Sequence, residues 1–191
     1  MGKMSKREFD LIVFGATGFT GQFVVEEVAQ TVAQDENKHI KWAIAGRNRE
    51  KLVKVLESAS NELKKKLNNI QIIEADISDE ESIVSMCKRT RVVINTVGPY
   101  RFYGEQVVKA CVDNGTHHVD ISGEAQWLER MQAKYHQQAE ENSCYIVGAC
   151  GWDSIPVDVG VQYVKKNFDG HLNLVETYAI RKSGKQVSVK S

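Results

Sequence analysis

Short apolar runs alternate with longer segments of helical periodicity along most of the chain. A wholly apolar run is typical of a parallel strand that is buried on both faces, whereas apolar residues at intervals of three and four are typical of a helix with one buried face. The pattern therefore predicts strands at 11–14, 42–45, 70–75, 92–97, 118–121 and 145–149. It predicts helices at 22–33, 48–66, 79–88, 105–114 and 125–142.

The regular alternation of these elements, with short connections between them, indicates the fold class. Parallel strands joined through helices form right-handed crossovers, so we expect an α/β fold with a doubly wound, mostly parallel sheet. This domain is expected to fill residues 9–151.

The remaining residues, 152–191, are expected to form the incomplete start of a second α/β domain for substrate binding or dimerisation. Pro156 suits the first turn of a helix, and four apolar residues share one face of that helix: Val157, Val161, Val164 and Phe168. Residues 172–180 look like a further strand, and the positively charged end, 181–191, is expected to fray.

A glycine-rich loop, Gly15-Ala-Thr-Gly-Phe-Thr-Gly21, follows the first expected strand and opens the first helix. A dinucleotide pyrophosphate needs backbone N–H groups, no Cβ in its way and the positive end of a helix. Gly15 permits the tight turn, Gly18 lets the backbone approach the phosphates, and Gly21 lets the helix lie close to the strand. In this position the loop predicts a Rossmann-like NAD(P)-binding fold; the alternative is a strand-to-helix turn that binds no ligand.

The end of the second expected strand bears on the choice of coenzyme. An NAD site usually has Asp or Glu here for the ribose 2′-hydroxyl, but residues 45–49 contain no acid. Arg47 can form a charge-assisted bond to a 2′-phosphate, and Arg49 or Lys51 could add a second charge. The alternative is that Arg47 is a solvated side chain at a helix start, which the helix dipole would mildly disfavour. The sequence therefore favours NADP over NAD.

Two further strand ends carry candidate contacts. Asp76 could accept a bond from the adenine amino group or cap the helix that follows, for which Ser78 and Asp79 are also candidates. Ligands in open α/β sheets bind at the carboxyl ends of the strands, so Asn95 and the residues up to Gly98 are expected to line the nicotinamide half of the crevice.

Five segments together resemble the saccharopine dehydrogenase-like oxidoreductases, from about Phe9 to Arg181: GATGFTG, AGRNREKL, NTVGPYRFYGEQVVKACVDNG, HHVDISGE and GWDSIPVDVG. The resemblance implies a Rossmann domain that binds NAD(P), followed by an α/β domain that shapes the substrate site and often the dimer. It implies pyrophosphate contacts from Gly15, Thr17, Gly18, Phe19 and Thr20. It also implies nicotinamide-side contacts from Val97 and Gly98, and it places Tyr100 and Tyr103 near the substrate.

The same resemblance bears on partners and location. Members of the family are much longer, so most of the second domain is expected to be missing here, and a homodimer would belong to a full-length form. The substrate is not identified by the resemblance. A lipid-like substrate, and peripheral contact with a membrane or lipid droplet, follow by analogy alone because relatives include reductases of lipid precursors.

Composition narrows the remaining classes of partner. The 25 Lys and Arg residues balance 25 Asp and Glu residues, so no nucleic-acid partner is expected. The four cysteines lack metal-ligand spacing, and the neighbours His117 and His118 would point to opposite faces of a strand, so no metal site is expected. The start is too polar for a signal peptide, and the longest uncharged apolar stretch, 11–25, is too short to span a bilayer. We expect a cytoplasmic protein.

Other residue groups carry side chains that could take part in catalysis. Tyr178 and Lys182 match a Y-x-x-x-K spacing, but a strand there would separate their side chains, so the match is interpreted as coincidence. Asp120 and Glu124 are expected to make cap or loop contacts, and nothing near Cys150 indicates an activated nucleophile.

The sequence thus predicts an NADP-dependent oxidoreductase that transfers a hydride. A coenzyme carries that chemistry itself, so no protein nucleophile is required. The proton donor is not assigned, and Tyr100 and Tyr103 are candidates by position alone. Two alternatives are a non-catalytic NADP-binding sensor or scaffold, and an interaction partner that has lost the coenzyme.

Overall fold

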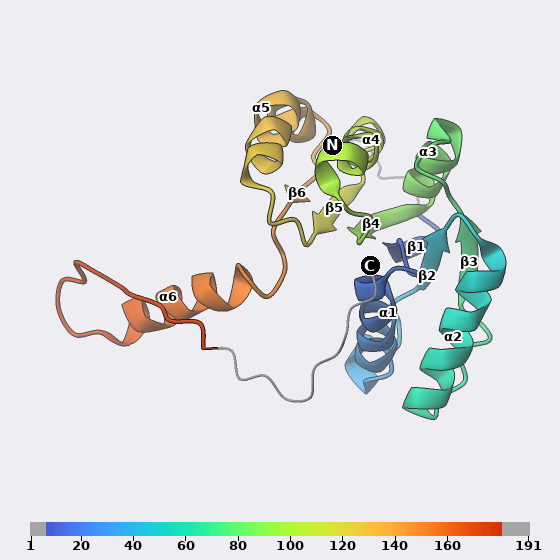
Figure 1. Cartoon of the computed structure of the whole chain (residues 1–191), viewed down its shortest axis with the longest axis horizontal. Coiled ribbons are helices and arrows are strands. Elements are labelled where there is room, and N and C mark those ends of the chain that lie inside the picture. The colour runs from blue at the N-terminus through green and yellow to red at the C-terminus, as the bar shows by residue number, and fades with distance from the viewer. Residues whose placement is uncertain (1–6, 181–191) are drawn as a thin grey trace. The chain divides into compact units, whose positions relative to one another are not determined.

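The computed structural model describes residues 7–180, and the chain divides between Gly151 and Trp152 into two units. The first unit contains six strands: β1 (Phe9–Phe14), β2 (Trp42–Gly46), β3 (Gln71–Glu74), β4 (Thr90–Asn95), β5 (His117–Asp120) and β6 (Ile146–Val147). They form one parallel sheet in the order β3-β2-β1-β4-β5-β6 (Figure 1). This confirms the predicted doubly wound parallel fold.

Five α-helices cover the sheet: α1 (Phe19–Val32), α2 (Arg49–Leu63), α3 (Glu80–Arg89), α4 (Tyr100–Asp113) and α5 (Ala125–Glu141). A short 3-10 helix at Asp35–Asn37 follows α1. Helices α1 and α2 lie on one face of the sheet, and α3, α4 and α5 lie on the other (Figure 1). The order of the strands reverses between β1 and β4, which is where ligands of such folds bind.

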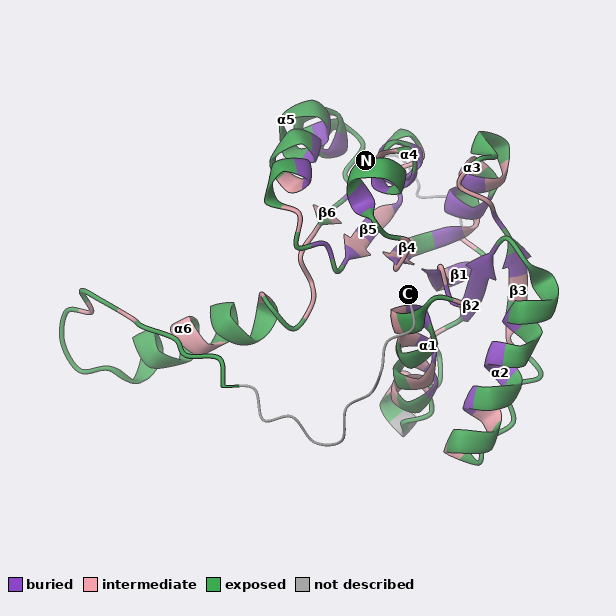
Figure 2. Ribbon diagram, viewed as in Figure 1, coloured by how far each residue is buried: buried purple, intermediate pink, exposed green. Residues whose placement is uncertain are grey.

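Strands β1 and β2 are largely buried, as their apolar sequences predict (Figure 2). Along β1, Ile12 and Phe14 pack toward α3 and α4, whereas Val13 packs with Val25 of α1 and Leu52 of α2. Each such side chain contributes about 1.5–3 kcal/mol on burial. Two layers of apolar contacts therefore fix the sheet beneath the ends of β1 and β4.

Some element boundaries differ from the sequence-based ones. The helix predicted to begin at residue 105 begins at Tyr100, directly after Pro99. The fourth strand ends at Asn95 rather than at residue 97, and the sixth strand is only two residues long. Pattern alone does not locate these ends, because helix starts depend on capping partners from elsewhere in the chain.

The second unit contains α6 (Ile155–Asn167), with Pro156 in its first turn as predicted. The strand predicted at 172–180 was wrong: these residues have no regular secondary structure, and Leu174, Tyr178 and Ile180 are all exposed. An apolar run becomes a strand only when its backbone finds a partner strand. The predicted frayed end, 181–191, and Lys182 of the Y-x-x-x-K match lie outside the described residues.

Between residues 7 and 180, no helix is both long enough and apolar enough to cross a membrane.

The close packing of α1 on the turn after β1 yields a first test. A Cβ added to Gly21 would lie 2.2 Å from the carbonyl oxygen of Gly15 and 2.9 Å from Cα of Ala16. We expect Gly21→Ala to lower the free energy of unfolding by about 1–3 kcal/mol, because the clash with rigid backbone outweighs the gain in helix propensity. Urea denaturation measures the change.

Gly123→Ala is the matched control, since nothing lies within 4 Å of the position its Cβ would take. Equal stability of the two variants would contradict the close approach of α1 to the turn.

Candidate functional site

The glycine loop forms a tight turn at the carboxyl end of β1. Gly15 has a φ of +84°, which other residues rarely adopt. A Cβ at this position would lie 2.7 Å from Cγ2 of Val97 and 2.8 Å from Oγ1 of Thr96. The Gly15 N–H donates to the carbonyl of Ala45 over 3.0 Å. The turn is thereby fixed between the ends of β2 and β4.

Helix α1 begins without a side-chain cap. Its N-cap is Gly18, no side chain accepts from the first-turn N–H groups, and the first turn has no acidic residue. The first N–H groups of a helix have no partner within the helix, and with the helix dipole they attract an anion. The start of α1 is therefore suited to a phosphate group.

The three glycines of the loop are needed for different structural reasons. Packing and backbone conformation explain Gly15 and Gly21 without any ligand. Gly18 is exposed and has an ordinary φ of −72°, and a Cβ there would lie 3.2 Å from the carbonyl oxygen of Gly15. Because Gly18 has no side chain, the start of α1 is open, and a phosphate group could approach its backbone.

A cleft of about 410 Å³ opens at this point. It is lined by the strand ends of β1 to β4 and by α4: Phe14, Gly15, Thr17, Gly18, Gly46, Arg47, Ala75, Asp76, Ile77, Ser78, Thr96, Val97, Gly98 and Tyr103. Eight residues singled out from the sequence therefore lie together in it. Five others do not line it: Phe19, Thr20, Gly21, Asn95 and Tyr100. Thr96 also lines the cleft, within the range from Asn95 to Gly98 that was expected to do so. Sequence reasoning missed Ile77 and Ser78 as lining residues, and their only signal is their place just after the third strand.

Arg47 and Asp76 lie at the ends of neighbouring strands in this cleft. Arg47 is exposed and precedes α2, whose cap is Asn48; its Oδ1 accepts from the Lys51 N–H over 2.9 Å. Arg49 does not line the cleft, and its exposed guanidinium lies 3.9 Å from the Glu74 carboxylate. Of the two arginines, Arg47 is thus the one that lines the cleft.

Asp76 does not cap a helix. Its Oδ1 accepts from the Ser78 N–H (2.9 Å) and hydroxyl (2.8 Å), whereas the cap of α3 is Asp79. These bonds, with a smaller effect of the Arg47 charge, lower the pKa of Asp76. Its carboxylate is therefore ionised near neutral pH and faces the cleft as an acceptor.

The two candidate tyrosines have different surroundings. Tyr100 is buried; its hydroxyl donates to the Asn95 carbonyl over 2.9 Å and accepts from the Ile121 N–H over 3.4 Å. Burial, opposed by that second bond, raises the pKa of Tyr100 well above its usual value. Tyr103 is 41% exposed and lines the cleft. Tyr103 is therefore the better placed of the two to reach a bound molecule.

The other acidic and thiol candidates make structural contacts. The Glu124 carboxylate accepts from the N–H groups of Tyr100 (2.8 Å) and Arg101 (3.0 Å), so it caps α4 across 24 residues of sequence. Asp120 accepts from loop N–H groups, as expected for a loop contact. Burial, assisted by Asp120, raises the pKa of the Cys150 thiol, which agrees with its not being an activated nucleophile.

A buried polar row crosses the ends of β4 and β5 close to the cleft. Asn95 and His118 are fully buried and Asp120 is 1% exposed. Burial lowers the pKa of His118 to about 4 and raises the pKa of Asp120. His117, on the other face, is only half-buried and its Nδ1 accepts from the Tyr145 N–H, so the two histidines point apart as predicted.

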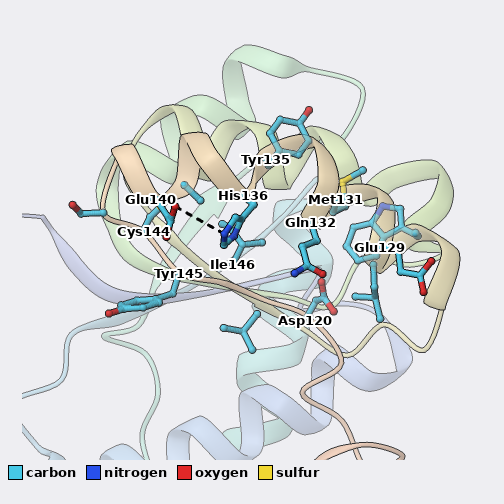
Figure 3. Close-up of a pocket in the computed structure, with 16 residues that line it drawn as sticks. Asp120, Glu129, Met131, Gln132, Tyr135, His136, Glu140, Cys144, Tyr145 and Ile146 are labelled. Carbon is cyan, nitrogen blue, oxygen red and sulfur yellow. Dashed lines mark ion pairs between the residues drawn. The ribbon is translucent and has the colours of Figure 1, made fainter.

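A second and larger cavity, about 820 Å³, lies between α5 and β6 (Figure 3). Asp120 and Gln132 point into one part of it, and the ion pair of His136 and Glu140, 3.9 Å apart, lies toward the other (Figure 3). None of the residues singled out for the coenzyme lines this cavity. The glycine-loop cleft is therefore the candidate site.

Comparison with known proteins agrees with the geometry. Residues 11–147 match the saccharopine dehydrogenase NADP binding domain. The chain is 51% identical over 170 residues to the lipid droplet localized protein of Caenorhabditis elegans, a match that covers 89% of this chain and 39% of that protein. It is 50% identical over 182 residues to the saccharopine dehydrogenase-like oxidoreductase of Homo sapiens, covering 94% of this chain and 42% of that protein.

A more distant relative is the trans-acting enoyl reductase of Mycobacterium ulcerans, 34% identical over 184 residues, with 95% of this chain and 42% of that protein covered. Among solved structures, apo saccharopine dehydrogenase (L-Glu forming) of Saccharomyces cerevisiae matches with a TM-score of 0.60 and 18% identity, over 83% of this chain and 31% of that one. That likeness supports the fold alone.

The chain spans about two fifths of the length of these curated relatives. The matched region contains both the glycine loop and the strand ends that form the cleft. The chain belongs to the saccharopine dehydrogenase-like oxidoreductase family and contains its NADP-binding domain.

Proposed function

We propose that this chain binds NADP(H) in the glycine-loop cleft and serves as the coenzyme domain of an oxidoreductase. One observation carries the proposal: the uncapped start of α1 and the guanidinium of Arg47 line the same cleft at the reversal of strand order. A diphosphate and a 2′-phosphate are the anions that such a pair of sites suits.

The residues of the cleft fit the parts of this coenzyme. The backbone from Gly15 to Gly21 would bind the diphosphate, and Arg47 would pair with the 2′-phosphate. The ionised Asp76 would accept from the adenine amino group. Val97 and Gly98 would contact the nicotinamide half of the coenzyme. Asn95 does not line the cleft, and it would contribute by accepting a hydrogen bond from the Val97 N–H and so holding the loop in place.

When bound, NADPH supplies the hydride, and the protein orients its nicotinamide against the substrate. Tyr103 is our candidate for a proton donor because its side chain lines the cleft, whereas the hydroxyl of Tyr100 is already bonded to backbone. We propose hydride transfer as the reaction class on the strength of family membership.

The substrate and setting are proposed from the relatives. An enoyl reductase and a lipid droplet localized protein among them support a lipid-like substrate and peripheral contact of a cytoplasmic protein with lipid droplets. We assign residues 9–151 to the dinucleotide-binding Rossmann domain and 152–191 to the start of a substrate or dimerisation domain. A homodimer would belong to the full-length form.

Fluorescence titration with NADPH and NADH tests the function. We expect NADPH to bind more tightly than NADH. Binding of NADPH without its oxidation across carbonyl, imine and enoyl substrates would favour a sensor or scaffold instead. Binding of neither coenzyme would contradict the proposal and favour an interaction partner that has lost the coenzyme.

Removal of the arginine tests the choice of coenzyme. We expect Arg47→Ala to weaken NADPH binding by about 1–3 kcal/mol and to leave NADH binding unchanged, because only NADPH carries the 2′-phosphate. Isothermal titration calorimetry measures both affinities. Lys54→Ala removes one positive charge from the exposed face of α2 outside the cleft, so it controls for general electrostatics. Equal losses for both coenzymes would refute the 2′-phosphate role.

Blocking the loop tests the diphosphate contact. We expect Gly18→Val to abolish binding of both coenzymes, because its side chain would occupy the approach to the start of α1. Gly123→Val carries the same added bulk at an open position and should bind normally. Normal coenzyme binding by a folded Gly18→Val protein, as judged by circular dichroism, would show that the loop geometry is not used in this way.

A further inference from the structure

Three polar side chains occupy buried positions of β4 and β5, where apolar side chains are usual. Asn95 ends β4, and His118 and Asp120 lie on the neighbouring β5, all of them essentially inaccessible to solvent. Burial of polar groups costs free energy unless each finds a partner. The row therefore needs an explanation beyond packing.

Asn95 holds the loop that follows β4. Its Oδ1 accepts from the Val97 N–H over 3.0 Å, and Thr96, Val97 and Gly98 all line the cleft. An N–H group only donates, so this bond fixes the side-chain amide with its oxygen toward the loop. The amide nitrogen, Nδ2, then faces β5.

The amide nitrogen meets the ring of His118. Nδ2 of Asn95 lies 3.3 Å from Nε2 of His118, and because Nδ2 only donates, Nε2 must be the unprotonated ring nitrogen. The ring proton is then on Nδ1, which lies 3.8 Å from Oδ2 of Asp120. That distance is too long for a hydrogen bond, but an N–H that faces a carboxyl oxygen is electrostatically favourable.

The surroundings keep the ring in this state. Burial lowers the pKa of His118 to about 4, so it is neutral near neutral pH. Asp120 is anchored in turn, because its Oδ1 accepts from the N–H groups of Ser122 (2.9 Å) and Ala149 (3.1 Å). A protonated Nε2 would oppose Nδ2 of Asn95 and favour rotation of the amide away from Val97.

We propose that His118 is a positioning residue for the coenzyme cleft: its Nε2 holds the Asn95 amide in the orientation that fixes Val97 and the loop from Thr96 to Gly98. The inference rests on the proposed NADP(H) function and extends it to a residue that does not line the cleft. Loss of the acceptor at Nε2 frees the amide, and the nicotinamide side of the cleft loses its shape.

The test separates positioning from simple core packing. His118→Leu removes the acceptor and keeps much of the bulk, whereas His118→Gln can present an oxygen close to the position of Nε2. Two ligands are titrated: NADPH and 2′,5′-ADP, which has the adenosine 2′-phosphate but no nicotinamide. Thermal unfolding is followed in parallel.

We expect His118→Leu to weaken NADPH binding by roughly tenfold, because a tenfold change in affinity corresponds to the free energy of about one hydrogen bond. Binding of 2′,5′-ADP, which lacks the nicotinamide, should change by less than about twofold. His118→Gln should recover most of the NADPH affinity. Thr116→Val is the matched structural control: it removes the buried bond from Thr116 Oγ1 to the Cys87 carbonyl just before β5, and it should lower stability without changing the ratio of the two affinities.

If His118→Leu leaves the ratio of the two affinities unchanged, whether because neither falls or because both fall equally, the proposal is overturned. Failure of the wild-type protein to bind NADPH would instead refute the proposed function. If His118→Leu does not fold, the wild-type protein provides a second test by NMR. Long-range ¹H–¹⁵N spectra should show the His118 ring proton on Nδ1. A proton on Nε2 would overturn the proposal.

Discussion

The contact between α1 and the turn after β1 is the constraint on which the rest of the structure depends. With 2.2 Å between the carbonyl oxygen of Gly15 and the position of a Cβ on Gly21, only glycine allows this approach. The contact sets α1 against the end of β1, where the strand order reverses. The uncapped helix start thus lies at the one edge of the sheet where the ends of β1 to β4 also contribute side chains.

Side-chain hydrogen bonds to the backbone hold the loops at that edge of the sheet. Polar side chains at the ends of β4 and β5 accept bonds from the backbone of nearby loops: Asn95 from Val97, and Asp120 from Ser122 and from Ala149 of the loop after β6. Glu124 caps α4 from the loop after β5. Such contacts fix loops that have few apolar side chains of their own, so the cleft is shaped before any ligand enters.

Family membership and the physics of the cleft support the same interpretation from independent directions. The matched region ends near β6, and the curated relatives are more than twice as long as this chain. The coenzyme contacts that we propose all lie within the matched region.

The sequence by itself determined the alternation of strands and helices, the doubly wound sheet, the glycine loop and the position of Arg47, because each depends on residues that are neighbours in the chain. It could not distinguish Asp76 from Asp79 as a helix cap or find the true start of α4, and it predicted a strand at 172–180 that has no partner. Only the tertiary structure joined His118 to Asn95 across 23 residues and Glu124 to Tyr100 across 24. These contacts depend on which strands and loops become neighbours, and no local pattern records that.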